Sequence, residues 1–160
     1  MSKVAVTVLE EGAPAPEITL PTDSGETFRL SALKGKNVVL YFYPKANTSG
    51  CTTEACEFRD AQPSFAGKNA VIVGISPDAE GAQSRFKSKY GLPFTLLCDV
   101  DRSVAQAYGV WKEKTMYGKK VMGIERSTFL IGKDGKIRNI FRKVKAAGHA
   151  AQVLEALSAL

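Results

Sequence analysis

Three short runs of apolar, largely β-branched or aromatic residues constrain the fold of this chain more than any other feature. They are "NVVLYFY" at 37–43, "AVIVGIS" at 70–76 and "FTLLC" at 94–98. Continuous apolar runs of this kind are typical of strands that are buried on both faces. Helix-like segments lie between them, over about 51–62, where the pattern meets Pro63, and over 79–90, where it stops at Gly91. This alternation predicts an α/β chain built around a parallel sheet.

The residues before the first run predict a small antiparallel hairpin. Its strands are "EITL" at 17–20 and "TFRL" at 27–30, and the Asp-Ser-Gly sequence at 23–25 supplies the turn. Ser31 is a suitable N-cap for a short helical turn that ends at Gly35. The chain is therefore expected to enter its first buried strand through a hairpin and one turn of helix.

The second half of the chain changes to antiparallel patterning. Strands are expected at 127–132 and 137–144, joined by "KDGK" at 133–136, whose Asp-Gly pair favours a hairpin. A short helix is expected at 101–110 and an amphipathic helix at 149–160. The apolar face of the closing helix carries Ala150, Val153, Leu154 and Leu157. Together the segments predict a central mixed β-sheet flanked by helices.

The length of 160 residues favours a single domain over 1–160 with its own core. No stretch approaches about 18 consecutive apolar residues, so no membrane span is predicted. Residues 1–13 form a loosely patterned start, and Glu10 and Glu11 interrupt its short apolar stretch, which makes it a poor signal peptide. The expected location is therefore the cytoplasm.

The chain is basic, with a formal net charge of +6 and a pI near 9.3. Small concentrations of positive charge occur at 112–120 and 142–145, but apolar or acidic residues interrupt both. Nucleic-acid binding usually needs a basic face within a recognisable module. We therefore expect a solvated surface and no nucleic-acid partner.

The cysteines are Cys51, Cys56 and Cys98, an odd number for a disulfide framework in an expected reducing compartment. The roles left open are catalysis, redox sensing and simple burial, and burial suits Cys98, which lies within an apolar strand. The C-x4-C spacing, with one distant cysteine and one histidine, does not match a four-ligand zinc site, so no metal or other cofactor is expected. The histidine, His149, begins the last predicted helix, where we expect a capping or surface role.

The segment "TSGCTTEAC" at 48–56 places Cys51 after a buried strand and in the first turn of a helix. Sites in open α/β sheets form beyond the carboxyl ends of the strands. Free backbone N–H groups and the positive end of the helix dipole favour a thiolate there, and the thiolate is the nucleophile. Gly50 lets a small molecule approach the backbone, and Ser49 or Thr48 can cap the helix or bind a ligand.

The spacing of Cys51 and Cys56 restricts how they can pair. In an intact α-helix their Cα atoms would lie roughly 8.7 Å apart, whereas a disulfide needs a Cα–Cα distance under about 7 Å. A bond between them therefore requires the start of the helix to unwind. The alternative is that Cys56 packs beneath the helix and takes no part in the chemistry. The spacing is also not the C-x-x-C of a dithiol oxidoreductase.

The longer segment "YFYPKANTSGCTTEACEFRD" at 41–60 resembles the active-site segment of the peroxiredoxins, specifically of the bacterioferritin-comigratory (Q-type) subfamily. Similar stretches continue in the expected order with "GISPD", "FTLLCDVD", "GIERSTFLI" and "KVKAAGH". The resemblance runs from about residue 10 to the C-terminus. It implies a thioredoxin-like fold and a cytoplasmic, monomeric, thiol-dependent peroxidase that needs no metal or haem.

The resemblance also implies roles for individual residues. Cys51 matches the peroxidatic cysteine, which would attack hydrogen peroxide or an alkyl hydroperoxide and become a sulfenic acid. Thr48 would hold the peroxide oxygens, Arg126 would stabilise the thiolate and the leaving oxygen, and Pro44 would shield the sulfur from water. Cys56 matches the resolving cysteine, which would form an intramolecular Cys51–Cys56 disulfide. Thioredoxin or a similar dithiol would reduce that disulfide. The implied role of the peroxidase is antioxidant defence.

Two positions depart from the subfamily pattern, because Ala46 stands where many members have an acid and Ser49 where they have a proline. The serine should leave the loop softer and alter how readily the site unwinds. Some members of the subfamily place the resolving cysteine in the next helix. The matching segment of this chain, "SRFKSKYG" at 84–91, contains no cysteine. Two other functions stay open. One is a redox-responsive binding module with slow turnover, and the other is a disulfide reductase, against which the absence of C-x-x-C speaks.

Overall fold

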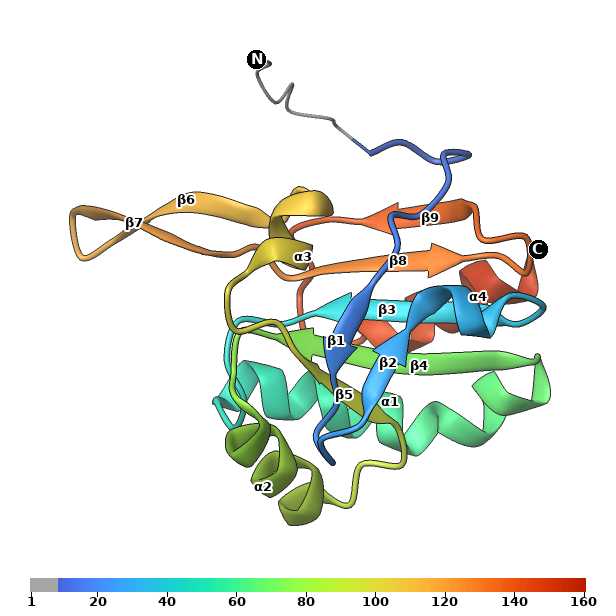
Figure 1. Cartoon of the computed structure of the whole chain (residues 1–160), viewed down its shortest axis with the longest axis horizontal. Helices are drawn as coiled ribbons and strands as arrows, with labels where there is room; N and C mark the ends of the chain where they lie inside the picture. The colour runs from blue at the N-terminus through green and yellow to red at the C-terminus, as the bar shows by residue number, and fades with distance from the viewer. Residues whose placement is uncertain (1–8) are drawn as a thin grey trace.

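A five-stranded mixed sheet in the order β5-β4-β3-β8-β9 forms the centre of the molecule (Figure 1). The computed structural model describes residues 9–160, so the loose start predicted for residues 1–13 lies mostly outside the described residues. The strands are β3 (Asn37–Phe42), β4 (Ala70–Ser76), β5 (Thr95–Cys98), β8 (Ser127–Ile131) and β9 (Ile137–Phe141). β3 pairs in parallel with β4, which pairs in parallel with β5, whereas β8 runs antiparallel to both β3 and β9. The predicted mixed sheet and its three apolar strands are confirmed.

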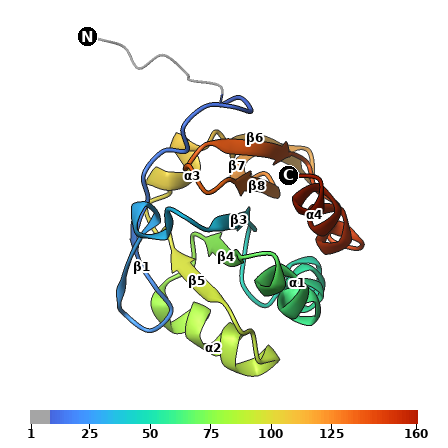
Figure 2. The same cartoon turned by 90° about the vertical axis from the view of Figure 1, so that its right-hand side faces the viewer.

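Both faces of the sheet are covered, which explains the unbroken apolar run in β3 (Figure 2). One face carries the helices α1 (Ser49–Gly67), α2 (Glu80–Tyr90) and α4 (His149–Ser158). The other face carries β1 (Thr19–Pro21), β2 (Thr27–Arg29) and α3 (Ser103–Ala107). Tyr41 points into the first layer and its neighbour Leu40 into the second, and both are fully buried. Within residues 9–160, no helix is both long and apolar enough to cross a membrane.

α1 begins earlier and ends later than the predicted range of about 51–62. It starts at Ser49 and continues through Pro63 to Gly67. A proline inside a helix costs about 3 kcal/mol or more, because it removes one backbone hydrogen bond and crowds the preceding turn. Phe65 lies beyond the proline and is fully buried in the core, which offsets roughly 2 kcal/mol of that cost. Tertiary packing therefore overrides the local stop signal.

The short helical turn after the N-terminal hairpin forms without the predicted cap. η1 (Leu30–Leu33) is a 3₁₀ helix whose N-cap is Arg29, and it ends two residues before Gly35. Ser31 lies inside η1, where its hydroxyl and its N–H both donate to the Glu17 carboxylate. The expectation that Ser31 caps the turn is therefore wrong, because its side chain joins η1 to Glu17, two residues before β1.

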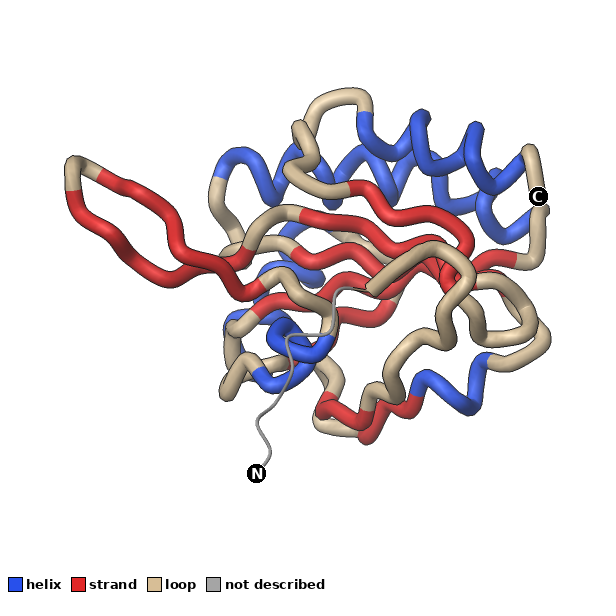
Figure 3. The backbone as a smooth tube through the Cα atoms, turned by 90° about the horizontal axis from the view of Figure 1, so that it is seen from above, coloured by secondary structure: helices blue, strands red, loops and turns tan. Residues whose placement is uncertain are grey.

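A hairpin that the sequence analysis did not predict projects from the body of the molecule (Figures 1 and 3). β6 (Trp111–Met116) and β7 (Lys119–Ile124) form a separate antiparallel sheet. Its turn holds Tyr117 and Gly118 at φ 53° and 77°, the left-handed pair that a two-residue hairpin turn requires. Residues 119–122 are exposed to solvent, so β7 lacks the apolar alternation that marks a half-buried strand.

Candidate active site

Cys51 lies in the first turn of α1, beyond the carboxyl end of β3, and its side chain is only 1% exposed. The first hydrogen bond of the helix runs from Thr52 N to Thr48 O (2.8 Å). The N–H groups of residues 49–51 therefore precede the helical ladder and point toward the helix N-terminus. Together with the helix dipole, they favour negative charge at the sulfur.

Arg126 reaches Cys51 from a distant part of the chain. It immediately precedes β8, whose first residue Ser127 pairs with Phe42 at the end of β3. This register brings together two residues that are 75 positions apart, and Arg126 Nη2 lies 3.4 Å from Cys51 Sγ. Burial alone would lower the pKa of Arg126, but the negative charges of Cys51 and Glu54 outweigh it and leave that pKa raised. Arg126 is therefore held as a cation beside the sulfur.

Gly50 allows this close approach. A Cβ atom added at position 50 would lie 3.2 Å from Arg126 Nη2. That distance is tighter than ordinary van der Waals contact, so any side chain here would press on the guanidinium that contacts Cys51. The glycine therefore makes room for the arginine within the site.

Glu54 is a site residue that the sequence analysis missed. Its side chain is 0% exposed, and Oε1 accepts a 2.7 Å hydrogen bond from Arg126 Nη1 within an ion pair. Burial raises the pKa of Glu54 to about 7, although Arg126 opposes the rise. A signal was present, because Glu54 follows Cys51 by three positions and so shares its helix face. The guanidinium of Arg126 thus bridges a carboxylate and a sulfur.

Two buried side-chain atoms among residues 9–160 lack a hydrogen-bond partner, and both belong to the same region. They are Tyr41 Oη and Glu54 Oε2. Burial raises the pKa of Tyr41 well above its usual value, and electrostatic interactions with neighbouring titratable side chains add to the rise. Unsatisfied buried polar atoms are rare in native proteins and gather at functional sites.

Thr48 and Pro44 lie in the loop that joins β3 to α1. Thr48 is the N-cap of α1, but its hydroxyl donates to the Lys45 carbonyl oxygen (2.9 Å) instead of capping the helix. The hydroxyl oxygen keeps lone pairs with which it can accept a hydrogen bond from a ligand. Pro44 is half-buried and directly follows Tyr43, whose N–H donates to Ile75 O (3.0 Å) where the sheet ends.

Hydrogen bonds fasten the same loop to α2 and to the segment after β4. Ala46 N donates to Asp78 Oδ2 (2.7 Å). Asn47 Oδ1 accepts from Tyr90 Oη (3.1 Å) and from Lys89 Nζ (3.5 Å). Asn47 adopts the left-handed conformation with φ 63°, which asparagine tolerates better than most residues. We call the contacts of Asn47 with Lys89 and Tyr90 the α2 latch, because they fix the start of α1 against the end of α2.

All three cysteines are free thiols in this structure. Cys56 is half-buried, and α1 is continuous from Cys51 to Cys56, so the Cα–Cα separation of roughly 8.7 Å expected for a helix applies. Cys98 is 3% exposed in β5, and burial, reinforced by nearby acids, raises the pKa of its thiol to about 11. Cys98 is therefore the buried residue that the sequence predicts, and it stays a thiol at neutral pH.

The expectation of a capping or surface role for His149 is wrong. His149 is 0% exposed, and the N-cap of α4 is Gly148. Its Nε2 shares a 2.7 Å hydrogen bond with Thr128 Oγ1, and its ring packs edge-on against Phe58 and Phe141. Burial lowers the pKa of His149. Across residues 9–160, no group of three or more histidine, cysteine or acidic side chains is arranged to hold a metal ion.

The AhpC/TSA family matches residues 12–140 of the chain. The chain therefore belongs to this family, the peroxiredoxins, which are thiol-dependent peroxidases. The family assignment agrees with the buried Cys51 in the first turn of a helix and with the arginine beside it. The peroxidase activity that the sequence resemblance implied is confirmed at the level of the family.

Individual relatives identify a narrower branch. Peroxiredoxin Bcp of Bacillus subtilis is 53% identical over 149 residues, which cover 93% of this chain and 95% of the relative. A cysteine mutant of Xylella fastidiosa PrxQ has a TM-score of 0.91 and 39% identity, covering 96% of this chain and 98% of that one. The bacterioferritin comigratory protein of Xanthomonas campestris, studied for its alkyl peroxide reduction, has a TM-score of 0.85 and 44% identity, covering 89% and 90%. The chain is a peroxiredoxin of the bacterioferritin-comigratory (Q-type) kind with a thioredoxin-like fold.

Proposed function

We propose that Cys51 is the peroxidatic residue and that it reduces hydrogen peroxide and alkyl hydroperoxides to water or alcohol. The observation that carries the proposal is the 3.4 Å contact between Arg126 Nη2 and the buried Cys51 Sγ. A fixed cation beside a buried sulfur favours the thiolate, which is the nucleophilic form. The alkyl peroxide reduction of the Xanthomonas campestris relative supports the same substrate class.

In the first step the Cys51 thiolate attacks one peroxide oxygen. The O–O bond breaks, both of its electrons leave with the second oxygen, and that oxygen takes a proton and departs as water or alcohol. Thr48 holds the peroxide oxygens, Arg126 stabilises the charge that develops on them, and Pro44 shields the sulfur from water. Cys51 gains the first oxygen and becomes a sulfenic acid, a two-electron oxidation.

In the second step Cys56 resolves the sulfenic acid. The Cys56 thiolate attacks the Cys51 sulfur, a disulfide forms, and the oxygen leaves as water after it takes a proton. Since intact α1 keeps the two Cα atoms too far apart, its first turns must unwind. Unwinding breaks the Thr52 N to Thr48 O bond and strains the α2 latch. Ser49, in place of proline, lowers the stiffness of this segment.

Thioredoxin or a similar dithiol then reduces the disulfide and returns both cysteines to thiols. Because the cysteine pair lies within one helix, the cycle needs no second copy of the chain, and we propose that the protein works as a monomer. We further propose one functional domain over 1–160, a cytoplasmic location, no cofactor, and a role in antioxidant defence. The mixed, interrupted distribution of its positive charge supports the absence of a nucleic-acid partner.

A coupled assay tests the peroxidase proposal. Thioredoxin-dependent consumption of peroxide is measured for the wild type, for Cys51→Ser, and for Cys98→Ser as the matched control. We expect the Cys51→Ser rate to fall to background and the Cys98→Ser rate to stay at the wild-type level, because Cys98 is a buried thiol. Equal rates for Cys51→Ser and the wild type would refute the assignment.

A trapping experiment tests the resolving role of Cys56. Cys56→Ser protein receives one equivalent of peroxide, and a sulfenic-acid probe with mass spectrometry reports on Cys51. We expect sulfenic acid to accumulate, because its intramolecular partner is gone. A disulfide between Cys51 and Cys98 would show instead that another thiol resolves the intermediate.

A further inference from the structure

A groove of about 420 Å³ separates the loop before α1 from α2. Three positive side chains, Lys45, Arg85 and Lys89, line it. None of the three forms an ion pair with an acidic side chain among residues 9–160. The acid in its wall, Asp78, is occupied, because its carboxylate accepts hydrogen bonds from Ala46 N (2.7 Å) and from a serine hydroxyl (2.7 Å). The groove therefore carries three basic side chains and one carboxylate, so its net charge is positive.

The groove lies on the same side of the molecule as Cys56. Arg59 follows Cys56 by three positions and shares its helix face. Its Nη1 donates to Tyr90 O (2.9 Å), and the Tyr90 hydroxyl contacts Asn47 in the groove wall (3.1 Å). The pKa of Arg59 is raised, chiefly by its hydrogen bond to Asp60. Arg59 therefore joins the helix face that carries Cys56 to the end of α2, and α2 borders the groove.

We propose that Lys45, Arg85 and Lys89, which we call the basic rim, form the docking surface for the dithiol reductant, and that the reductant meets them with acidic residues around its attacking cysteine. This inference rests on the proposed Cys51–Cys56 cycle. Attack on a disulfide requires direct contact between the two proteins around the sulfur atoms, so the partner must cover the surface beside Cys56. Complementary charge there accelerates encounter and fixes orientation.

The docked reductant reduces the Cys51–Cys56 disulfide by thiol–disulfide exchange. One thiolate of the partner attacks a sulfur of the Cys51–Cys56 disulfide, and a mixed disulfide forms while the other cysteine leaves as a thiolate and takes a proton. The second thiol of the partner then displaces this chain from the mixed disulfide. Two electrons pass from the partner dithiol to Cys51 and Cys56, and the partner is left with the disulfide.

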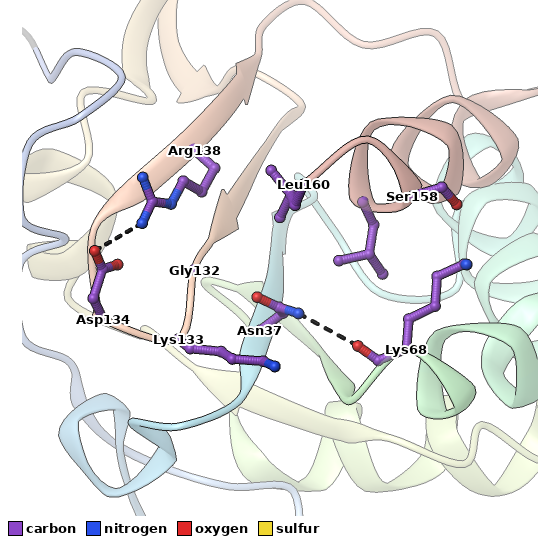
Figure 4. Close-up of a pocket in the computed structure, with 9 residues that line it drawn as sticks. Asn37, Lys68, Gly132, Lys133, Asp134, Arg138, Ser158 and Leu160 are labelled. Carbon is purple, nitrogen blue, oxygen red and sulfur yellow. Dashed lines mark hydrogen bonds and ion pairs between the residues drawn. The ribbon is translucent and has the colours of Figure 1, made fainter.

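A second basic cavity, at the opposite end of the sheet, supplies a matched control (Figure 4). It encloses about 670 Å³ between the start of β3, the end of α1 and the β8–β9 turn, where Lys68 and Lys133 lie without an ion pair among the described residues. Arg138 in the same cavity is paired with Asp134 (2.7 Å). Lys68 and Lys133 carry the same charge as two rim residues but lie far from the cysteines.

The test compares Lys45→Glu/Arg85→Glu with Lys68→Glu/Lys133→Glu, and it leaves Lys89 in place because Lys89 also belongs to the α2 latch. All four substituted side chains are exposed. The probe is an acidic bacterial thioredoxin, and kcat/KM for it is measured at low and high salt. We expect about a tenfold or larger fall for the rim variant at low salt, with loss of the salt dependence, and less than about a twofold change for the control variant.

Two further measurements separate docking from catalysis. The rate of Cys51 oxidation by peroxide and the turnover with dithiothreitol should be unchanged in both variants, because neither small reactant needs the rim. Peptide mapping after one equivalent of peroxide checks that the Cys51–Cys56 disulfide forms. Its absence overturns the proposed cycle and the docking surface together. Its presence, with equal thioredoxin kinetics in the two variants, overturns the docking surface alone.

Discussion

Arg126 divides its guanidinium between two side chains, Cys51 and Glu54. One terminal nitrogen contacts the sulfur at 3.4 Å and the other the carboxylate at 2.7 Å. Glu54 therefore acts as a positioning residue, because it fixes the plane of the guanidinium through a charge-assisted hydrogen bond. A bridging arginine of this kind is not equivalent to a lysine, which carries one point charge.

This bridging predicts a large effect for Arg126→Lys. The lysine keeps the charge but cannot contact the sulfur and the carboxylate in one plane. We expect the second-order rate of Cys51 oxidation, measured by stopped-flow fluorescence, to fall by about 100-fold. Arg138→Lys is the control, since Arg138 pairs with Asp134 in the distal cavity and should leave the rate unchanged. A fall of less than about threefold in Arg126→Lys would contradict the role.

Glu54 also predicts a dependence of stability on pH. Its folded-state pKa of about 7 lies above its ordinary value of 4.5, chiefly because it is buried. Between these two pH values the folded protein keeps a proton that the unfolded chain releases, so the free energy of unfolding falls as the pH rises from 4.5 to 7. Burial lowers the pKa of His149 from its ordinary value of 6.5. Just below pH 6.5 the unfolded chain therefore binds more protons at this residue than the folded protein, so its contribution makes the free energy of unfolding rise with pH.

Comparison with Glu54→Gln isolates the contribution of this carboxyl group. Urea unfolding of the reduced proteins is followed from pH 4.5 to pH 8, and the contribution of His149 cancels in the difference. We expect the wild type to lose on the order of 3 kcal/mol relative to Glu54→Gln across the window. Parallel stability profiles for the two proteins would show that Glu54 does not titrate there.

At the scale of elements, the proposed resolving step requires the start of α1 to unwind while the sheet stays intact. The α2 latch ties the loop before α1 to Tyr90 through Asn47. A hydrogen bond of this kind contributes about 1 kcal/mol. If α1 unwinds before the disulfide forms, weakening the α2 latch makes unwinding easier and so lowers the barrier to disulfide formation.

Tyr90→Phe removes the latch hydroxyl and little else. We expect disulfide formation after peroxide treatment to become about threefold to fivefold faster, since about 1 kcal/mol of the folded-helix stability is lost. Tyr108→Phe is the control, because its hydroxyl donates to Pro16 O on the other face of the sheet. Quenched-flow alkylation measures the rate, and an unchanged or slower rate in Tyr90→Phe would argue against the latch.

The sequence predicted elements well where burial leaves a local pattern. β3 and β4 are buried on both faces, so their apolar runs identify them. The β6–β7 hairpin was not predicted because its exposed residues carry no such pattern. α1 continues past Pro63 because tertiary packing, to which Phe65 contributes, opposes the local stop signal. In the site, the motif around Cys51 is local and was predictable. The role of Glu54 was not, because it depends on an arginine 72 positions away.

At the scale of the whole molecule, the proposed catalytic pair, Cys51 and Cys56, lies in one helix, and this placement predicts kinetics that do not depend on protein concentration. Disulfide formation after peroxide treatment should be first order, with the same rate constant over a tenfold range of protein concentration. Both redox forms should sediment with the mass of one chain. A rate that rises with concentration, or a disulfide-linked dimer on non-reducing gels, would contradict the monomeric cycle.

The pairing of Phe42 with Ser127 has a consequence for how such a site can diversify. Arg126 is positioned by the sheet register and not by the length of chain that separates it from Cys51. The β6–β7 hairpin just before it can therefore gain or lose residues at its Tyr117–Gly118 tip while the arginine stays at the sulfur. Insertions and deletions at that tip would change the outer surface, while the strand register that holds Arg126 beside Cys51 would stay the same.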